Sequence, residues 1–384
     1  SAPPIKAVKF GKDIVMGDET VLFRHDKTFY HPTTLLVEIA DTLTDEEIQA
    51  KLDDVNGLEF DRVGLHYSLD GVAIVENSGS PDRFAQVVSK VAAGTERSLV
   101  LLSENVDALK AALPGVADRK PLIGSATEAN YEAVVNLAKE HNVPVIIKAD
   151  GLDALAALVE NAQKLGYKEF VLDPGSRAPS QTLANLTHIR RLAIKKKFRP
   201  FGYPVIAYTS KNEPLAEIAE ASVYVCKYAS AIVLKASAKA HLLPLMSLRQ
   251  NIYTDPQKPI QVEPVLHSVG DVNENSPVYI TTNFSLTYYS VEGEVEATKI
   301  PSYILPIDTD GTSVLTAYAA GKFEPEKIAD ALAKSGVADK VSHRNLIIPG
   351  YVAVISGKLQ EVSGWKVIVD PREASGILSF ARSL

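Results

Sequence analysis

The sequence predicts an α/β protein of two units, in which a barrel of eight β/α repeats precedes a smaller, open α/β sheet. Eight short apolar runs recur over the first 240 residues, and a helix-like stretch follows each of them. After residue 253 this rhythm stops, and four further strand-like runs alternate with helices in the rest of the chain. Short apolar strands that alternate with helices indicate parallel β/α units, and eight such units favour a closed TIM barrel.

The eight predicted barrel strands are almost continuously apolar, as expected for parallel strands that are buried on both faces. They read TTLLVEIAD (33–41), RVGLHYS (62–68), SLVLLS (98–103), KPLIGSA (120–126), PVIIKAD (144–150), EFVLDPG (169–175), PVIAYTS (204–210) and AIVLKAS (231–237). The predicted helices repeat apolar residues at three- and four-residue spacing, most clearly over 45–55, 83–94, 132–142 and 152–166. Thr44 with Glu47 matches a capping box, and Gly94 and Gly166 stand where left-handed helix ends are expected.

Composition and charge argue against several classes of function. Hydrophobic residues make up 46% of the 384 residues, and a formal net charge of −7 gives no reason to expect nucleic acid or an anionic membrane as partner. No apolar run approaches the roughly 20 residues that span a bilayer, and the N-terminal SAPPIKAVKFGKD has no signal-peptide core. The single cysteine, Cys226, can form no internal disulfide, so a reducing, cytoplasmic location is predicted.

Polar residues follow most of the predicted barrel strands, where a barrel enzyme would carry its chemistry. Helix capping alone explains many of them, but Lys148 and Lys235 could act as Schiff-base amines, and Asp173 in DPGSRAPS could bind a heterocycle or a phosphate. No HExxH, CxxC, GxSxG, P-loop or GxGxxG pattern is present, so no metal or nucleotide site is predicted. The candidates are Asp41, His66, Ser68, Asp70, Ser103, Glu104, Ser125, Lys148, Asp150, Asp173, Ser176, Arg177, Ser210, Lys211, Lys235 and Ser237.

The second unit is expected over 263–384, after a proline-rich connector that ends a barrel of residues 1–262. Its predicted strands lie within 277–285, 302–314, 343–352 and 365–378. In a doubly wound sheet a ligand binds beyond the carboxyl ends of the strands, so the residues there are candidates, although DGTS before a helix is also ordinary capping chemistry. The candidate binding residues are Thr282, Asn283, Phe284, Asp308, Thr309, Asp310, Gly311, Thr312, Ser313, Val314, Pro349, Gly350 and Gly376.

The segments ILPIDTDGTSVLTAYAAGKF, NLIIPGYVAVISGKLQEVSGWKVIVDP and DPREASGIL carry a resemblance to one family. Together with the order of barrel, connector and small unit, they make the chain similar to the large (gamma) subunit of the corrinoid iron–sulfur protein of the acetyl-CoA decarbonylase/synthase system. The resemblance extends over essentially all 384 residues. It implies a flavodoxin-like small domain that binds a base-off corrinoid (cobalamin), and a barrel that serves as a scaffold for subunit docking.

The resemblance also implies a methyl carrier of the reductive acetyl-CoA pathway rather than a stand-alone enzyme. The implied partners are the small corrinoid iron–sulfur protein subunit in a heterodimer, a methyl-tetrahydrofolate:corrinoid methyltransferase and acetyl-CoA synthase. The family's cobalt-facing loop corresponds to Asp308 through Val314, with Thr312 near the cobalt, and the nucleotide tail would run among Thr282, Asn283, Phe284, Pro349, Gly350 and Gly376. Other corrinoid domains place a histidine in a DxHxxG loop, whereas Asp308-Thr-Asp-Gly-Thr has none, which fits a cobalt without a strong protein ligand.

One departure from the family concerns its small four-cysteine domain, which holds a [4Fe–4S] cluster. The sequence with its single Cys226 does not include that domain, so this chain is expected to bind corrinoid without being reactivated by the physiological route. Two alternatives stay open at this point. The barrel could be an enzyme, either a pterin-dependent methyltransferase or a Schiff-base lyase, or both units could form a scaffold without a ligand.

Overall fold

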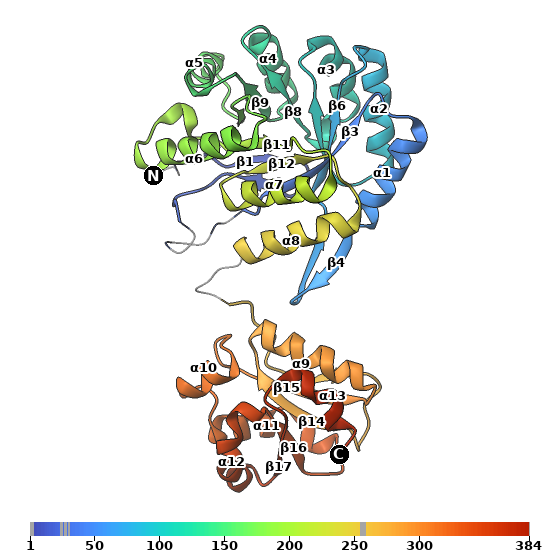
Figure 1. Cartoon of the computed structure of the whole chain (residues 1–384), viewed down its shortest axis with the longest axis vertical. Coiled ribbons are helices and arrows are strands. Elements are labelled where there is room, and N and C mark those ends of the chain that lie inside the picture. Colours follow the sequence, from blue (N-terminus) through green and yellow to red (C-terminus); the bar gives the residue numbers. More distant parts are fainter. Residues whose placement is uncertain (1–3, 24–25, 27–28, 30, 254–258, 384) are drawn as a thin grey trace. The chain divides into compact units, whose positions relative to one another are not determined.

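The computed structural model describes residues 4–23, 26, 29, 31–253 and 259–383, and it divides the chain into two compact units (Figure 1). The first unit comprises 1–60 and 67–254, and the second comprises 61–66 and 255–384. Each unit has its own hydrophobic core, and each is described separately below. Among the described helices, none is both long and apolar enough to cross a bilayer.

The first unit is the predicted eight-stranded parallel barrel. Its strands follow the order β10-β9-β8-β7-β6-β3-β12-β11, and a parallel bridge between Leu172 and Val205 joins β10 to the residue before β11. The backbone N–H of Leu172 also donates to the carbonyl of Pro204 at 2.8 Å. The strands are β3 (Thr34–Ala40), β6 (Gly71–Val75), β7 (Ser98–Leu102), β8 (Leu122–Ala126), β9 (Val145–Lys148), β10 (Phe170–Asp173), β11 (Ile206–Tyr208) and β12 (Ala231–Leu234).

The prediction for the second barrel strand is wrong. Residues 62–68 belong instead to a two-stranded sheet of β4 (Glu59–Arg62) and β5 (Leu65–Ser68), and β6 at Gly71–Val75 is the barrel strand. Val63 and Gly64 both have positive φ, at 52° and 74°, as the central residues of a type I′ hairpin require. The two hairpin strands are partly exposed, whereas GVAIV of β6 is buried over its first four residues.

Helices surround the barrel, and their ends test three of the predictions. The capping box at Thr44 and Glu47 is confirmed, since each side chain accepts a hydrogen bond from the other's backbone N–H. The predicted left-handed conformation is confirmed at Gly166, where φ is 74°. Gly94 has no positive φ, and glycine fits there because a Cβ would lie 2.6 Å from the Leu52 side chain. The helices are α1 (Asp45–Gly57), α2 (Pro81–Gly94), α3 (Val106–Ala112), α4 (Tyr131–His141), α5 (Leu152–Gln163), α6 (Pro179–Lys195), α7 (Pro214–Cys226) and α8 (Lys239–Tyr253).

The barrel interior is a packed apolar core, not a channel. Inward-facing residues of several strands, such as Leu36 of β3, Val100 of β7 and Val171 of β10, form one buried cluster. A short hairpin of β1 (Val8–Phe10) and β2 (Ile14–Met16) adds Phe10 and Met16 to that cluster. Its turn lies at the amino end of the barrel strands, because the N–H of Gly11 donates to the carbonyl of Lys120 just before β8.

The second unit is a five-stranded sheet with the order β13-β15-β14-β16-β17, in which only β13 is antiparallel. In chain order the parallel strands are thus arranged second, first, third, fourth, as in doubly wound sheets. The order reverses between β14 and β16, so the ligand rule points to the carboxyl ends of these two strands. The strands are β13 (His267–Val269), β14 (Val278–Thr282), β15 (Ser302–Ile307), β16 (Asn345–Ile348) and β17 (Lys366–Val369).

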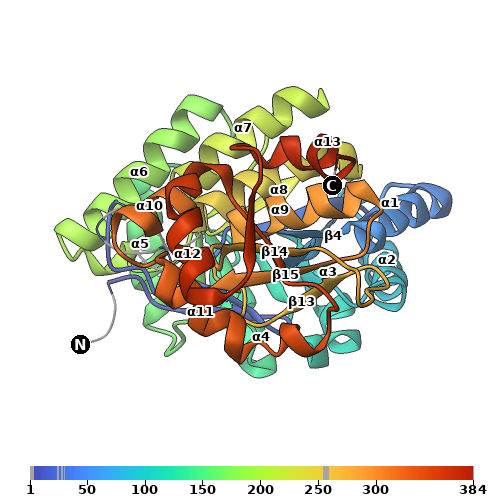
Figure 2. The same cartoon turned by 90° about the horizontal axis from the view of Figure 1, so that it is seen from below.

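Helices cover both faces of this sheet, as Figure 2 shows for α9 and α11 on opposite sides of β14 and β15. One face packs against α10 (Val314–Ala319), α11 (Pro325–Lys334) and α12 (Ser356–Ser363). The other face packs against α9 (Ser285–Thr298) and α13 (Ile377–Ala381). Both cores are apolar, so the polar residues at the carboxyl ends of the strands stand out as the part of this unit that packing does not explain.

Candidate functional site

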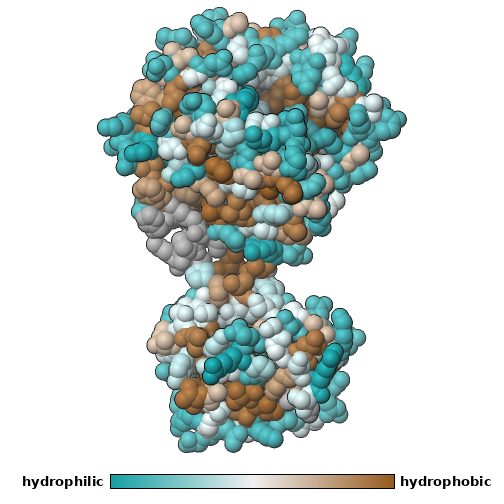
Figure 3. All heavy atoms as spheres, in the orientation of Figure 1, coloured by the Kyte–Doolittle hydropathy of each residue, from teal (hydrophilic) through white to brown (hydrophobic). Residues whose placement is uncertain are grey.

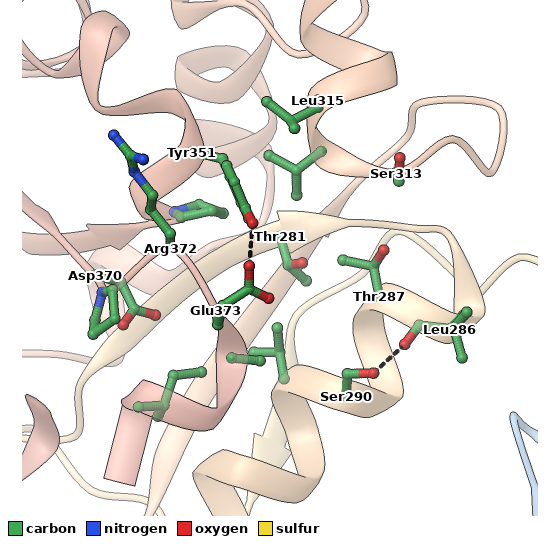
Figure 4. Close-up of a pocket in the computed structure, with 16 residues that line it drawn as sticks. Thr281, Leu286, Thr287, Ser290, Ser313, Leu315, Tyr351, Asp370, Arg372 and Glu373 are labelled. Carbon is green, nitrogen blue, oxygen red and sulfur yellow. Dashed lines mark hydrogen bonds between the residues drawn. The ribbon is translucent and has the colours of Figure 1, made fainter. Parts of the chain in front are cut away.

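A pocket of about 330 Å³ opens at the carboxyl ends of the strands of the second unit (Figure 4). Helix α9 forms one wall, the start of α10 a second, and the segments after β16 and β17 the others. The pocket therefore lies where the strand order of the sheet reverses. It is lined by Thr281, Leu286, Thr287, Ser290, Val291, Ser313, Val314, Leu315, Pro349, Tyr351, Asp370, Pro371, Arg372, Glu373, Ala374 and Ile377.

Exposed apolar side chains surround this pocket. Leu286 is 53% exposed, Leu315 50% and Tyr351 40%, and all three line the pocket. Hydrophobic residues are visible among hydrophilic ones on the surface of the second unit in Figure 3. Apolar residues around a concave, partly polar site are typical of surfaces that bind a ligand or a partner.

Buried polar atoms without partners concentrate at the same strand ends. Five buried side-chain polar atoms lack a hydrogen-bond partner in the described part of the chain, and four of them belong to Thr281, Thr282, Ser285 and Asp370. Thr281 and Thr282 end β14, Ser285 begins α9, and Asp370 follows β17 directly. Buried polar atoms are almost always satisfied in folded proteins, so this concentration calls for an explanation that packing alone does not give.

Among these groups at the strand ends, Asp370 is the one that carries an ionisable carboxyl, so its burial reduces the stability of the fold most. Burial raises the pKa of its carboxyl to about 7, and no cation offsets that effect. Its backbone N–H donates to the carbonyl of Ile348 at 3.0 Å, which fixes the residue against the end of β16. A carboxyl group that is held in place, partly buried and unpaired reduces stability, and such groups occur mainly at functional sites.

We expect the stability of the second unit to fall as pH rises from about 4 to about 7, because in this range the unfolded chain has lost the Asp370 proton that the folded chain still holds. Asp370→Asn should flatten this fall and make the variant more stable than the wild type at pH 7. Fluorescence of Trp365 measures the effect, since it is the only tryptophan of the chain and is buried in the second unit. Equal pH profiles for the two proteins would contradict the prediction.

Asn283 organises the loop after β15. Its Oδ1 accepts hydrogen bonds from the backbone N–H groups of Thr309 and Gly311, at 2.9 and 3.1 Å, and from the Thr309 hydroxyl at 3.1 Å. Its Nδ2 donates to Gln261 at 3.1 Å and to Asp308 at 3.2 Å. The oxygen and the nitrogen of one buried amide therefore both form hydrogen bonds with the tight turn of 308–311.

The glycines of the candidate list are explained by contacts within the chain. Gly311 has φ of 68°, and a Cβ there would lie 2.8 Å from the Gln261 side chain. A Cβ on Gly350 would lie 2.3 Å from the carbonyl oxygen of Asp370, and one on Gly376 2.6 Å from Pro371. These positions allow the loops at the strand ends to pack closely on one another, so substitution of Gly311 tests the loop rather than a ligand contact.

The predicted site residues form three groups in the structure. Ser313, Val314 and Pro349 line the pocket itself. Asn283, Asp308, Thr309, Gly311 and Thr312 form the hydrogen-bonded loop beside it, in which the Thr312 hydroxyl donates to the Thr309 carbonyl at 2.8 Å. The remaining predicted residues lie near the strand ends without lining the pocket: Thr282, Phe284, Asp310, Gly350 and Gly376.

The mouth of the barrel contains a second, more polar pocket of about 390 Å³, in which Lys148 and Arg177 are each paired with a carboxylate, whereas burial raises the pKa of the Glu38 carboxyl. Lys148 donates to Glu104 at 2.6 Å, Lys235 donates to Asn212 at 2.6 Å, and Arg177 is bonded to both carboxylate oxygens of Asp173. Neither lysine is the isolated amine that a Schiff-base enzyme needs. Among the described residues, no group of three or more His, Cys, Asp or Glu side chains could hold a metal ion.

Three barrel candidates do not lie at the carboxyl ends of the barrel strands. His66 and Ser68 belong to the β4–β5 hairpin, and Asp70 precedes β6 at the amino end. Asp70 pairs with Arg249 and accepts the backbone N–H of Leu35 at 2.7 Å, so it is part of the packing between β3 and α8. These errors follow from the misplaced second strand.

Comparison with known proteins identifies the family. A family model described as "CO dehydrogenase/acetyl-CoA synthase delta subunit" matches residues 7–381. The corrinoid/iron–sulfur protein large subunit of Moorella thermoacetica is 57% identical, and the alignment covers 100% of this chain and 86% of that protein. The chain belongs to the family of this large subunit.

Archaeal members of the same family are named as gamma subunits of the acetyl-CoA decarbonylase/synthase complex. Those of Methanothermobacter thermautotrophicus and Archaeoglobus fulgidus are 35% and 34% identical, over 100% and 98% of this chain and 87% and 83% of their own. Among solved structures, dihydropteroate synthase from Thermus thermophilus aligns with 65% of this chain and all of its own at 17% identity, with a TM-score of 0.45. That structural similarity is too weak to support an argument about ligands of the barrel.

Sequence reasoning missed most of the residues that line the pocket. Thr281, Leu286, Tyr351 and Asp370 were not among the candidates, although all follow or end strands of the small unit. Asp370 is recognisable in the sequence as the first polar residue after the strand KVIV. Its missing partner, however, depends on which loops meet around it, and the sequence does not contain that information in readable form.

Proposed function

We propose that this chain is a methyl-carrier subunit that holds a base-off corrinoid at the carboxyl ends of the strands of its second unit. The observation that carries the proposal is the pocket itself, in which exposed apolar side chains surround buried polar atoms without partners. A corrinoid has a large apolar macrocycle with amide-bearing side chains, so both features fit it. The relative from Moorella thermoacetica, which is named a corrinoid/iron–sulfur protein large subunit, supports this choice of ligand.

The 308–314 loop and the neighbouring strand ends would hold the group. Thr312, which is positioned by the Asn283 network, would lie near the cobalt, and Thr282, Asn283, Phe284, Pro349, Gly350 and Gly376 would lie along the nucleotide tail. When bound, the corrinoid supplies a cobalt that can accept and release a methyl group. The residues of the loop and strand ends would fix the position of the corrinoid and supply no strong ligand to its cobalt.

The absence of histidine at these strand ends supports a cobalt that no protein nitrogen coordinates, which is compatible with the proposed base-off state. The segments 281–290, 307–316, 349–354 and 370–376 contain no histidine. His267 lies on β13 and bonds the carbonyl of Glu263 at 2.9 Å, and His343 precedes β16 and bonds the carbonyl of Ser276 at 3.0 Å. The Thr312 hydroxyl already donates to the Thr309 carbonyl, and a hydroxyl is a weak ligand for cobalt.

The partners of the proposed carrier follow from the family rather than from a surface of this chain. They are the small corrinoid iron–sulfur protein subunit, a methyl-tetrahydrofolate:corrinoid methyltransferase and acetyl-CoA synthase. The barrel, proposed over 1–262, would serve as the scaffold for subunit docking, and 263–384 would hold the corrinoid. At the barrel mouth Lys148 is paired with Glu104 and Arg177 with Asp173, which agrees with a scaffold role for the barrel rather than with a Schiff-base site.

A pocket-filling variant tests the proposal. We expect the full chain to retain hydroxocobalamin through gel filtration under anaerobic conditions, with a base-off absorption spectrum, and Ser290→Trp to reduce the retained cobalt about tenfold or more. Ser290 lines the pocket from α9, so an indole there occupies the volume that the ligand needs.

Glu296→Trp is the matched control, because Glu296 is exposed on the same helix and does not line the pocket. Equal retention by both variants would place the corrinoid elsewhere. No retention by a folded wild-type chain, alone or copurified with its small subunit, would overturn the proposed function.

A further inference from the structure

We propose that Thr281 and Asp370 form a recognition point for one hydrogen-bond donor of the corrinoid and that this point rejects a carboxylate in the same place. This inference rests on the proposed function and goes beyond it, because it assigns to two residues the chemical selectivity of the pocket. The donor is an N–H of a side-chain amide or an O–H of the ribose in the nucleotide tail. Both are neutral groups that present a hydrogen to an acceptor.

The two residues come from different strands and line one pocket. Thr281 is the penultimate residue of β14, is fully buried, and has a hydroxyl oxygen without a partner. Asp370 follows the last residue of β17, and its Oδ1 is likewise buried and unpartnered. Both side chains are drawn among the lining residues in Figure 4, with Glu373 and Tyr351 beside them.

No other side chain of the lining bonds these two atoms, and three of the lining hydroxyls bond elsewhere. The Tyr351 hydroxyl donates to Glu373, and the Ser290 hydroxyl donates to the carbonyl of Leu286 at 2.7 Å (Figure 4). The Ser313 hydroxyl bonds Thr316 at 3.1 Å. The hydroxyls of Tyr351, Ser290 and Ser313 are thus used within the chain, whereas Thr281 and Asp370 keep acceptor capacity for a group from outside.

The charges around this point favour a neutral donor over an anion. Asp370 and Glu373 are the acids of the lining, and Arg372 is its one cation. A ligand carboxylate beside Asp370 would place two like charges in a partly buried site, which costs binding free energy. An amide or hydroxyl would instead donate a hydrogen bond to a buried acceptor that otherwise has no partner. A site of this kind discriminates strongly against analogues that lack the donor.

The experiment compares corrinoids that differ at one group. Affinities of the full chain are measured at pH 8 for hydroxocobalamin, for its monocarboxylic acids with one propionamide hydrolysed in each, and for cobinamide, which lacks the nucleotide tail. The variants are Asp370→Asn, which can donate to a carboxylate, and Asp370→Ala, which can neither donate nor accept. Asp330→Asn is the matched control, since Asp330 is an exposed acid of α11 that pairs with Lys334.

If the donor is a side-chain amide, the wild type binds one monocarboxylic acid about tenfold or more weakly than hydroxocobalamin, and Asp370→Asn removes that difference. If the donor is the ribose hydroxyl, Asp370→Ala weakens hydroxocobalamin by a similar factor and leaves cobinamide unchanged. In either case Asp330→Asn behaves as the wild type. Wild-type affinity of Asp370→Ala for every corrinoid would overturn this inference alone, whereas a folded wild type that binds none of them would overturn the proposed function as well.

Discussion

Asn283→Asp is expected to destabilise the second unit by about 3 kcal/mol and to abolish corrinoid retention. The substitution keeps the size of the side chain but replaces the Nδ2 donor by a second carboxylate oxygen. That oxygen would face Gln261 and the carboxylate of Asp308, to which Nδ2 now donates at 3.2 Å. Since Asn283 is 1% exposed, water cannot compensate for the lost bonds or screen the repulsion.

Chemical unfolding followed by Trp365 fluorescence measures this effect, because that residue reports on the second unit alone. Asn345→Asp is the matched control, since Asn345 lies at the exposed start of β16 and undergoes the same chemical change. A loss below about 0.5 kcal/mol for Asn283→Asp, within the range of ordinary surface substitutions, would show that the loop does not depend on the amide.

Glu220→Ala is expected to destabilise the barrel by at least about 3 kcal/mol. The carboxylate of Glu220, on α7, accepts the backbone N–H of Ser210 at 2.9 Å, the N–H of Lys211 at 3.1 Å and the Tyr224 hydroxyl at 2.6 Å. It is 7% exposed, so alanine leaves these three donors without an acceptor and creates a small cavity.

Calorimetry or far-UV circular dichroism measures this loss, while Trp365 fluorescence should remain unchanged because the second unit has its own core. Glu160→Ala, at an exposed position of α5, removes the same side chain without removing a buried acceptor. Equal stability of the two variants would contradict the role assigned to Glu220.

The architecture could be predicted because both units repeat simple local patterns. Seven of the eight predicted runs contain a barrel strand, and in each the apolar core of the strand is visible in the sequence. The exception, 62–68, has β-branched and aromatic residues, but its partner is the adjacent segment 59–62 rather than another barrel strand. A hairpin and a barrel strand differ in their neighbours, and neighbours are a tertiary property.

The candidate site could be located from the sequence but not built from it. Asn283 and the 308–314 loop were predicted because polar residues at the ends of parallel strands meet at one edge of a sheet. The role of Gly350 depends on Asp370, which is 20 positions away in the sequence and 2.3 Å from where its Cβ would be. The unpaired state of Thr281 and Asp370 is likewise a statement about missing neighbours, and a residue pattern does not show what is missing.

The seam between β10 and β11 gives the barrel a preferred place to open. Other neighbouring strands of the barrel pair over several residues, whereas β10 and the residues before β11 share one bridge, at Leu172 and Val205. The N–H of Leu172 also donates a hydrogen bond to the carbonyl of Pro204. Pro204 has no N–H and therefore donates no backbone hydrogen bond to β10. At the carboxyl end of these two strands Arg177 connects them through its side chain. It forms a salt bridge with Asp173 of β10, and its guanidinium lies 4.1 Å from the centre of the Tyr208 ring of β11. Transient local unfolding, and with it the exchange of backbone amide hydrogens, should therefore be fastest along this line. The segment DPGSR, which contains both Asp173 and Arg177, thus holds β10 and β11 together at their carboxyl ends.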